Sequence, residues 1–293
     1  MKIDNIQRLM KMILTLLISM SLFTSCQRSE PVFAREDLSQ SKTVHDVAYG
    51  QDTAQRMDIY LPANRSVNST KSIILIHGGG WNGGSKNDFA TYIDSFKKRM
   101  PDYAIFNINY RLVNGSNLFP TQEQDVKAAV DFIVGNSKNY GINKSKIVLL
   151  GASAGGHLAL LQGYKYNNPD VVAVIDFFGP TDLIAMFEKP WHPYVPFVLQ
   201  MVTGTTPSQN RKLYQESSPI NYVNAHSAPT LILHGSNDNV VNVSQSKALK
   251  TKLDNANVKN ELVIYPGKSH GWYGETLSNS FDRIETFLRE NVE

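Results

Sequence analysis

The hexapeptide Gly151-Ala152-Ser153-Ala154-Gly155-Gly156 restricts the fold of this chain more than any other stretch. It follows a strand-like run at residues 146–150 and precedes an apolar stretch that we expect to be helical from about His157. A Gly-x-Ser-x-Gly pattern between a strand and a helix is typical of a tight turn that holds a serine hydroxyl above the edge of a sheet. Small residues beside the serine let the strand and the helix approach closely. We therefore expect Ser153 to be an exposed nucleophile, and a tight turn without chemistry is the alternative.

Strand-like and helix-like stretches alternate along most of the chain. An antiparallel hairpin is expected at one sheet edge, from residues 43–49 and 56–61. Further strands are expected at residues 72–76, 103–110, 146–150, 171–178, 230–235 and 261–265, and helices at 88–100, 121–133, 244–255 and 277–290. This alternation predicts an α/β fold, with a mainly parallel sheet and helices on both faces.

Two further residues follow predicted strands in the second half of the chain. Asp238 comes shortly after the strand at 230–235, and His270 lies on the loop after the strand at 261–265. Loops at the carboxyl ends of parallel strands meet at one sheet edge, and the order nucleophile, acid, histidine fits such an arrangement. A serine hydroxyl needs a histidine base, and that histidine needs a carboxylate to fix its tautomer. Ser153, Asp238 and His270 are therefore the predicted catalytic residues.

Other acids and histidines receive structural interpretations. Asp125 and Asp131 do not follow strands, so we assign them to a helix surface or a helix cap. His77 and His234 are interpreted as residues that stabilise loops at strand ends. The sequence has no His-Glu-x-x-His motif and only one cysteine, so we predict no metal site.

The segment His77-Gly78-Gly79-Gly80-Trp81 follows the predicted strand at 72–76. Unsubstituted backbone there can turn its amides inward, so we assign an oxyanion hole to the amides of Gly79, Gly80 and Ala154. Residues 78–83 also match a Gly-x-Gly-x-x-Gly pattern, but a dinucleotide site is disfavoured because no clear helix opens after Trp81. A phosphate-binding loop is excluded, since the Gly-Lys-Ser/Thr order is missing.

The N-terminus resembles the signal of a bacterial lipoprotein. Basic residues precede an apolar stretch at residues 12–23 that is too short for a comfortable membrane span, so residues 1–25 are predicted to be a signal peptide. The single cysteine, Cys26, follows directly and is the expected lipidation site. We expect an exported protein, anchored by lipid and facing the periplasm or the cell surface. An ordinary cleaved signal that happens to contain a cysteine is the alternative.

The rest of the chain divides into a tether and one domain. Residues 26–42 are predicted to be the tether, and residues 43–293 the α/β domain. Within that domain, residues 183–223 lose the alternating pattern and are expected to form a partly helical lid. Trp81, Trp191 and Tyr194 are candidate substrate-binding residues, although the two lid aromatics fit a packing role equally well. Beyond residue 25 the chain has 26 basic and 25 acidic residues, so it lacks the excess of positive charge that is typical of nucleic-acid-binding proteins.

Several ordered motifs together resemble the hormone-sensitive-lipase-like and BD-FAE esterases. The resemblance covers roughly residues 43 to 290. Its motifs are residues 77–81, 109–112, 119–129, 151–156, 218–219, 234–238 and 270–271. It implies an α/β-hydrolase fold and hydrolysis of carboxylic esters through a serine acyl-enzyme, without cofactor. Members of the group include acetyl and feruloyl esterases of plant polysaccharides, kynurenine formamidase-like enzymes and general carboxylesterases.

The hypothesis from the sequence is an exported serine esterase of small acyl esters, with acetyl groups on carbohydrate as the candidate substrate. A serine peptidase or a kynurenine formamidase-like amidase of the same fold is the enzymatic alternative. A carbohydrate-binding lipoprotein on a hydrolase scaffold is the non-enzymatic alternative.

Overall fold

The structure is a computed structural model that describes residues 37–292. The predicted signal peptide, Cys26 and most of the predicted tether lie outside this range, so their assignments stay predictions. Within residues 37–292, no helix is both long and apolar enough to cross a lipid bilayer.

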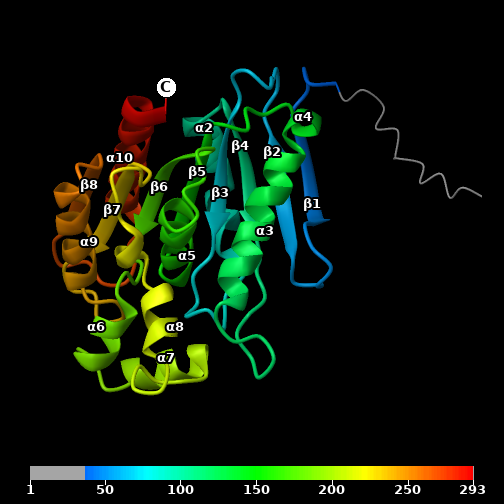
Figure 1. The fold of residues 1–293 in the computed structure, drawn as a ribbon. Helices are drawn as coiled ribbons and strands as arrows, with labels where there is room; N and C mark the ends of the chain where they lie inside the picture. Colours follow the sequence, from blue (N-terminus) through cyan, green and yellow to red (C-terminus); the bar gives the residue numbers. More distant parts are fainter. Residues whose placement is uncertain (1–36, 293) are drawn as a thin grey trace, which may run out of the picture. The chain divides into compact units, whose positions relative to one another are not determined.

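An eight-stranded sheet forms the centre of the described domain (Figure 1). Its spatial order is β1-β2-β4-β3-β5-β6-β7-β8. β2 runs antiparallel to β1 and β4, and every other neighbouring pair is parallel. The strands are β1 (Lys42–Ala48), β2 (Arg56–Leu61), β3 (Lys71–Ile76), β4 (Tyr103–Ile108), β5 (Ile147–Ala152), β6 (Val171–Phe177), β7 (Thr230–Gly235) and β8 (Asn260–Tyr265). The predicted edge hairpin and mainly parallel sheet are confirmed.

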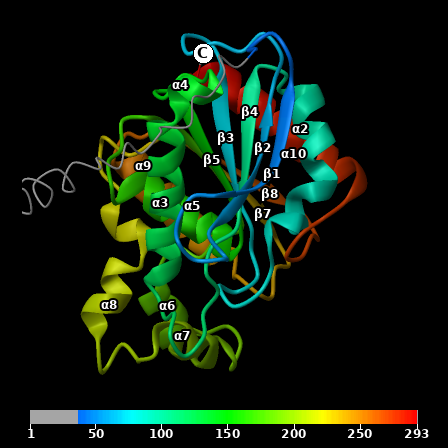
Figure 2. The ribbon, with the colours of Figure 1, turned by 90° about the vertical axis from the view of Figure 1, so that its right-hand side faces the viewer.

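Helices cover both faces of this sheet. In Figure 2, α3, α5 and α9 lie on one face, and α2 and α10 lie on the other. These helices are α2 (Ile93–Arg99), α3 (Thr121–Gly135), α5 (Ala154–Tyr164), α9 (Ser244–Asn255) and α10 (Gly274–Val292). The short helix α4 (Ser137–Tyr140) follows α3. Two separate hydrophobic clusters result, one on each face of the sheet.

Sequence pattern explains why these elements pack as they do. Residues 72–76 of β3 are all buried, as expected of a strand that is covered on both faces. In α10 the apolar residues Phe281, Ile284, Leu288 and Val292 fall on one face at helical spacing and are buried against the sheet.

The register of the sheet aligns the carboxyl ends of its parallel strands. Ile76, Gly151, Asp176, Ile232 and Leu262 are successive partners across β3, β5, β6, β7 and β8. The segments that follow these five positions therefore start from the same edge of the sheet. The glycine segment, Ser153 and the loops of Asp238 and His270 all begin there.

The structure corrects two predicted helices. The predicted helix 88–100 is a 3-10 helix, η2 (Lys86–Tyr92), followed by α2, because Ser85 and Asp88 form a capping box that starts the helix earlier. Helix α5 begins at Ala154 rather than near His157, and the His157 amide donates to the Ser153 carbonyl oxygen at 3.0 Å. The glycines in its first turn concealed this start.

The segment 183–223 connects β6 to β7 and is mainly helical. Figure 1 shows its helices grouped beyond one end of the sheet. They are α6 (Leu183–Glu188), α7 (Val195–Thr203), α8 (Arg211–Glu216) and the 3-10 helix η3 (Pro219–Tyr222). Residues 183–223 are thus partly helical, and their function as a lid stays a prediction.

Candidate active site

Ser153 stands on the turn between β5 and α5 with a strained backbone. Its φ and ψ angles are 55° and −119°, a left-handed φ that is rare for a residue with a side chain. Strain of this kind persists only where the surrounding structure fixes the conformation. Here the Ser153 amide donates to the Phe177 carbonyl oxygen at 2.8 Å and so ties the turn to β6.

The glycines around Ser153 are required by close backbone contacts. A Cβ at Gly155 would overlap the carbonyl oxygens of Ile76 and His77, which end β3. A Cβ at Gly151 would overlap the carbonyl of Gly155. The predicted reason for the small residues, close approach of strand and helix, is therefore present in the structure.

Two consecutive hydrogen bonds connect Ser153 to His270 and His270 to Asp238. His270 Nε2 lies 2.9 Å from Ser153 Oγ, and His270 Nδ1 lies 2.6 Å from Asp238 Oδ2. The Asp238 side chain is fully buried and the His270 side chain is 19% exposed. The structure thus brings together the three residues that the sequence singled out, in the geometry that activates a serine hydroxyl.

Asp238 is held as a carboxylate by its donors. Burial raises its pKa, but hydrogen bonds from His234 and His270, the charge on His270 and the Val241 amide outweigh burial and hold the pKa below its usual range. Asp238 Oδ1 accepts the backbone amides of Val240 at 2.8 Å and Val241 at 2.9 Å. Asp238 is therefore ionised at neutral pH.

His234 has a closer relationship to this group than the sequence suggested. Rather than only stabilising its loop, it places Nε2 3.2 Å from Asp238 Oδ2. Its ring is fully buried, and its Nδ1 lies 2.6 Å from Ser246 Oγ on α9. The spacing of four residues between His234 and Asp238 was visible in the sequence, but the turn that folds one onto the other was not.

A second buried carboxyl group lies behind the serine turn. Asp176 on β6 is fully buried, and its Oδ1 accepts the Gly179 amide at 2.9 Å. Within the described residues its Oδ2 has no hydrogen-bond partner. Burial raises the pKa of Asp176 to about 7. The charge of His234 and the hydrogen bond from the Gly179 amide lower this pKa, but by less than burial raises it.

The glycine segment after β3 has an unusual backbone. Gly79, Gly80 and Trp81 have φ angles of 105°, 59° and 61° in succession. Trp81 is held in this conformation at two points, because its carbonyl accepts the Val113 amide at 2.8 Å and its indole N–H donates to His157 Nδ1 at 3.2 Å. Burial lowers the pKa of His157 to about 4, so its ring is a neutral acceptor.

This segment packs directly against the serine turn. A Cβ on Gly78 would lie 2.8 Å from the Ala152 carbonyl oxygen and 3.3 Å from Ser153 Cβ. Ala154 opens α5, so its amide has no hydrogen-bond acceptor within the helix. The predicted donors Gly79, Gly80 and Ala154 thus lie on segments adjacent to Ser153.

A cavity of about 380 Å³, which we call the lid cavity, opens at Ser153. Trp81 and Tyr194, two of the three predicted pocket residues, line it, and Trp191 does not. The Trp191 indole N–H instead donates to the Asn239 carbonyl oxygen at 3.2 Å. The full lining is Gly80, Trp81, Ser153, Pro180, Met186, His192, Tyr194, Val195, Val198, Leu199, Asn239, Val240 and Val241. Apart from Ser153, His192, Tyr194 and Asn239, these side chains suit an uncharged group.

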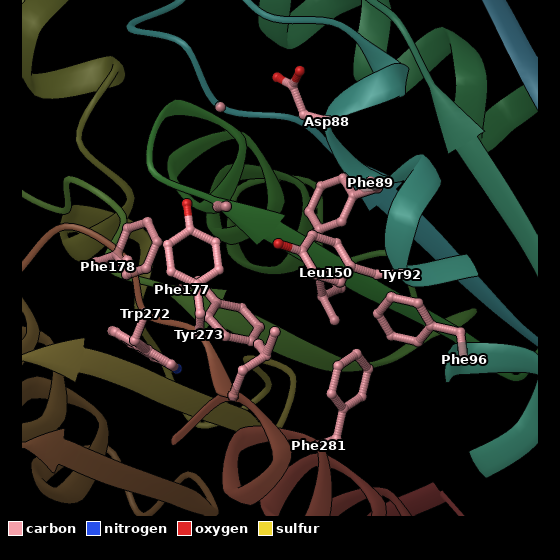
Figure 3. A pocket seen from close by; sticks show the side chains of 14 residues that line it. Asp88, Phe89, Tyr92, Phe96, Leu150, Phe177, Phe178, Trp272, Tyr273 and Phe281 are labelled. Atoms are coloured by element: carbon pink, nitrogen blue, oxygen red, sulfur yellow. The ribbon is translucent and has the colours of Figure 1, made fainter. Parts of the chain in front are cut away.

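A second cavity, of about 180 Å³, is lined mainly by aromatic side chains (Figure 3). We call it the aromatic cavity. Three of its wall residues, Gly78, Ala152 and Gly271, are chain neighbours of Gly79, Ser153 and His270. The remaining walls are Asp88, Phe89, Tyr92, Phe96, Leu150, Phe177, Phe178, Trp272, Tyr273, Leu277 and Phe281. The Phe178 ring also packs on His270, with ring centroids 4.4 Å apart.

Sequence reasoning missed the aromatic cavity. Phe89, Tyr92 and Phe96 recur at helical spacing, and Phe177-Phe178 and Trp272-Tyr273 are adjacent pairs. Such patterns indicate a buried face, but they do not show that a space is left between the rings.

Of the two acidic residues that we assigned to a helix surface or cap, Asp131 has the predicted role and Asp125 does not. Asp131 is exposed and pairs with Lys127 at 2.6 Å, as predicted for a helix surface. Asp125 is buried instead, because Arg111 and Gln55 neutralise and bind its carboxylate; Gln55 Nε2 lies 2.8 Å from Oδ1. Neither lies with Ser153 and His270. Among residues 37–292, no group of three or more His, Cys, Asp or Glu side chains is placed to hold a metal ion.

Comparison with known proteins gives a family match and several relatives. The model of the BD-FAE family matches residues 57–253. Esterase LipC of Mycobacterium tuberculosis is 28% identical over 263 residues, which cover 84% of this chain and 64% of LipC. The chain therefore spans less than two thirds of the length of this curated relative.

Solved structures share the fold. A truncated carbohydrate esterase from gut microbiota has a TM-score of 0.69 and 28% identity, covering 86% of this chain and 99% of that one. A bifunctional GH43-CE protein of Bacteroides eggerthii has a TM-score of 0.71 and 28% identity, covering 85% of this chain and 38% of its own. Together with the strand order, these matches confirm the predicted α/β-hydrolase fold.

Proposed function

The chain belongs to the BD-FAE family, and on that premise we propose that it is a serine carboxylesterase that hydrolyses small acyl esters, with acetyl esters on carbohydrate as the substrate. The observation that carries the proposal is the pair of hydrogen bonds that connects Ser153 to His270 and His270 to Asp238. It supplies a nucleophile, a base and the carboxylate that orients the base. Esterase LipC and the carbohydrate esterase from gut microbiota support the same assignment.

The reaction proceeds in two halves. Ser153 Oγ attacks the ester carbonyl carbon while its proton passes to His270 Nε2, and the carbonyl oxygen becomes an oxyanion beside the amides of Gly79, Gly80 and Ala154. His270 then gives the proton to the departing alkoxide, which leaves an acyl group on Ser153. In the second half, water attacks this acyl-enzyme with His270 again as the base, and the acid and free Ser153 are released.

The mouth of the lid cavity supports a carbohydrate as the alcohol part. Tyr194 is 69% exposed there, and its ring stacks on His192 with centroids 5.2 Å apart. An exposed aromatic face is a surface against which the apolar side of a sugar ring can pack. The apolar wall of Met186, Val198 and Leu199 suits a small uncharged acyl group.

The test is a comparison of substrates with the purified chain from residue 27 onward. Acetate release from acetylated xylo-oligosaccharides, with a steep fall in p-nitrophenyl ester turnover beyond the butyryl chain, is the expected result. Turnover of long-chain esters without any acetate release from the sugar would move the assignment to a lipid carboxylesterase. Preference for an N-formyl amide or a peptide would favour the amidase or peptidase alternatives, and binding without turnover would favour a carbohydrate-binding protein.

The aromatic cavity favours a second candidate substrate, an ester with an aromatic group. Its space of about 180 Å³ exceeds an apolar protein cavity of about 150 Å³ that is known to accept benzene. Methyl hydroxycinnamates should then be hydrolysed with a KM that rises in Leu277→Trp, a change that fills the cavity from α10. Acetate ester turnover in the same variant serves as the control. No hydrolysis of hydroxycinnamates by the wild-type chain removes this candidate.

We also propose export and lipid attachment at Cys26, on the basis of the sequence alone. Cells that express the full chain should incorporate labelled palmitate into it, and Cys26→Ser should abolish the label. Equal labelling of both proteins would refute attachment at this residue.

A further inference from the structure

His234 contacts the carboxylate of Asp238 without taking part in the proposed proton transfers. It is the penultimate residue of β7 and is fully buried. Its Nε2 lies 3.2 Å from Asp238 Oδ2 and 2.8 Å from the Val241 carbonyl oxygen. Its Nδ1 lies 2.6 Å from Ser246 Oγ. Both ring nitrogens are therefore held by fixed partners.

These partners determine the tautomer of the ring. A carbonyl oxygen and a carboxylate can only accept hydrogen bonds, so Nε2 must carry a proton. In the neutral ring Nδ1 is then an acceptor, and the Ser246 hydroxyl donates to it. This Nε2–H donates to the Val241 carbonyl oxygen at 2.8 Å and lies 3.2 Å from Asp238 Oδ2, the same oxygen that accepts from His270 Nδ1 at 2.6 Å.

Four polar groups surround the Asp238 carboxylate. Oδ1 accepts the amides of Val240 and Val241, Oδ2 accepts from His270, and the His234 Nε2–H lies 3.2 Å from Oδ2. Loss of this N–H would remove a positive dipole from beside Oδ2 and leave more of its negative charge directed at His270.

We propose that His234 is a positioning residue, whose N–H holds Asp238 Oδ2 beside His270 and moderates the attraction between that oxygen and His270. The proposal rests on the proposed function, since it takes His270 as the base. An oxygen that lies beside a second N–H dipole stabilises the His270 imidazolium less than an oxygen without one. His234 therefore extends activity to lower pH, because His270 is ready to accept the Ser153 proton sooner as pH rises.

Other titratable groups near His234 must be separated from this effect. Asp238 faces it from its own loop and Asp176 from β6, while α9 presents the uncharged Ser246. The Phe178 ring, which approaches His234 edge-on at 6.3 Å, carries no charge. Because Asp176 titrates near neutral pH, the experiment is done both in the wild-type background and in Asp176→Asn.

Two amide substitutions at His234 form a matched pair. In His234→Gln the amide nitrogen lies near the former Nε2 and can still donate to Asp238. In His234→Asn it lies near the former Nδ1, where it can reach Ser246 but not Asp238. Both variants bury a neutral amide in place of a ring, so a purely structural defect would affect them alike.

The measurement is kcat/KM for p-nitrophenyl acetate from pH 5 to 9. In His234→Asn the midpoint of the low-pH limb should rise by about half a unit to one unit, so that kcat/KM at pH 6 falls roughly three- to tenfold relative to its value at pH 9. His234→Gln should keep the wild-type midpoint. An unmoved midpoint in folded His234→Asn, or equal shifts in both variants, would overturn the proposal.

A second measurement needs neither turnover nor a His234 variant. In the full chain with ¹⁵N-labelled histidine and Ser153→Ala, the His234 Nε2–H resonance should move with the same midpoint as the His270 Nδ1–H resonance, because both protons share Oδ2. A His234 resonance that stays constant while His270 titrates would contradict the proposal. Failure of the proposed function would show differently, as full ester turnover by Ser153→Ala.

Discussion

Ser153 Oγ and His270 Nε2 lie 2.9 Å apart although 117 positions separate the two residues in the chain. Ser153 is placed by the turn between β5 and α5, and His270 by the loop after β8. Two segments that are far apart in the chain therefore meet at this hydrogen bond.

Replacement of the nucleophile should abolish turnover while the fold persists. In Ser153→Ala we expect kcat for p-nitrophenyl acetate to fall by roughly 10⁴-fold or more, because no acyl-enzyme can form. Stopped-flow release of p-nitrophenol should show a burst with the wild-type chain and none with the variant. Equal rates for the two proteins would remove Ser153 as the nucleophile.

The carboxylate of Asp238 should be essential for the rate. Asp238→Asn should lower kcat by about 10³- to 10⁴-fold, since a neutral amide neither fixes the His270 tautomer nor stabilises its imidazolium. Asp131→Asn removes an exposed carboxylate on α3 and should leave the rate unchanged. Steady-state kinetics on both variants distinguish loss of the hydrogen bond between Asp238 and His270 from a general effect of removing a negative charge. A similar rate in both would contradict the role of Asp238.

The amino-acid sequence was sufficient to predict the order of the strands in the chain and the three hydrogen-bonded residues Ser153, His270 and Asp238. Each of these residues follows an apolar run, and parallel strands bring the ends of such runs to one edge. The contacts of Trp191 and His234 could not be predicted, because they depend on turns whose backbone angles no periodicity encodes. The buried position of Asp125 was missed for a related reason: its partner Arg111 belongs to a different segment.

Packing of the serine turn should be sensitive to a single methyl group at Gly155. A Cβ there would overlap the carbonyl oxygens that end β3, so Gly155→Ala should destabilise the fold by about 3 kcal/mol or more. Gly135→Ala is the matched control, because a Cβ at that position on α3 meets no atom within 4 Å. It should stabilise the helix by up to about 1 kcal/mol. Chemical denaturation of both variants measures the difference, and equal stability would show that the turn can relax.

The raised pKa of Asp176 makes a prediction about stability. Burial raises this pKa from 3.8 to about 7, so between these values the carboxyl group is neutral in the folded chain and ionised in the unfolded chain. The stabilisation is complete below pH 3.8 and is lost as pH rises toward 7. His157, with its pKa lowered to about 4 by burial, has the opposite dependence. The pH profile of the wild-type chain alone would therefore conceal the contribution of Asp176.

Comparison with Asp176→Asn isolates that contribution, because His157 is present in both proteins. Asparagine does not ionise. The free energy of unfolding of the variant, relative to that of the wild-type chain, should therefore increase by up to about 4 kcal/mol as pH rises from 4 to 7. The difference should then become constant above pH 7. Urea denaturation at closely spaced pH values provides the two curves. Parallel curves from pH 4 to 8 would mean that Asp176 is already ionised in the folded protein at pH 4, and that its Oδ2 has a partner such as a buried water.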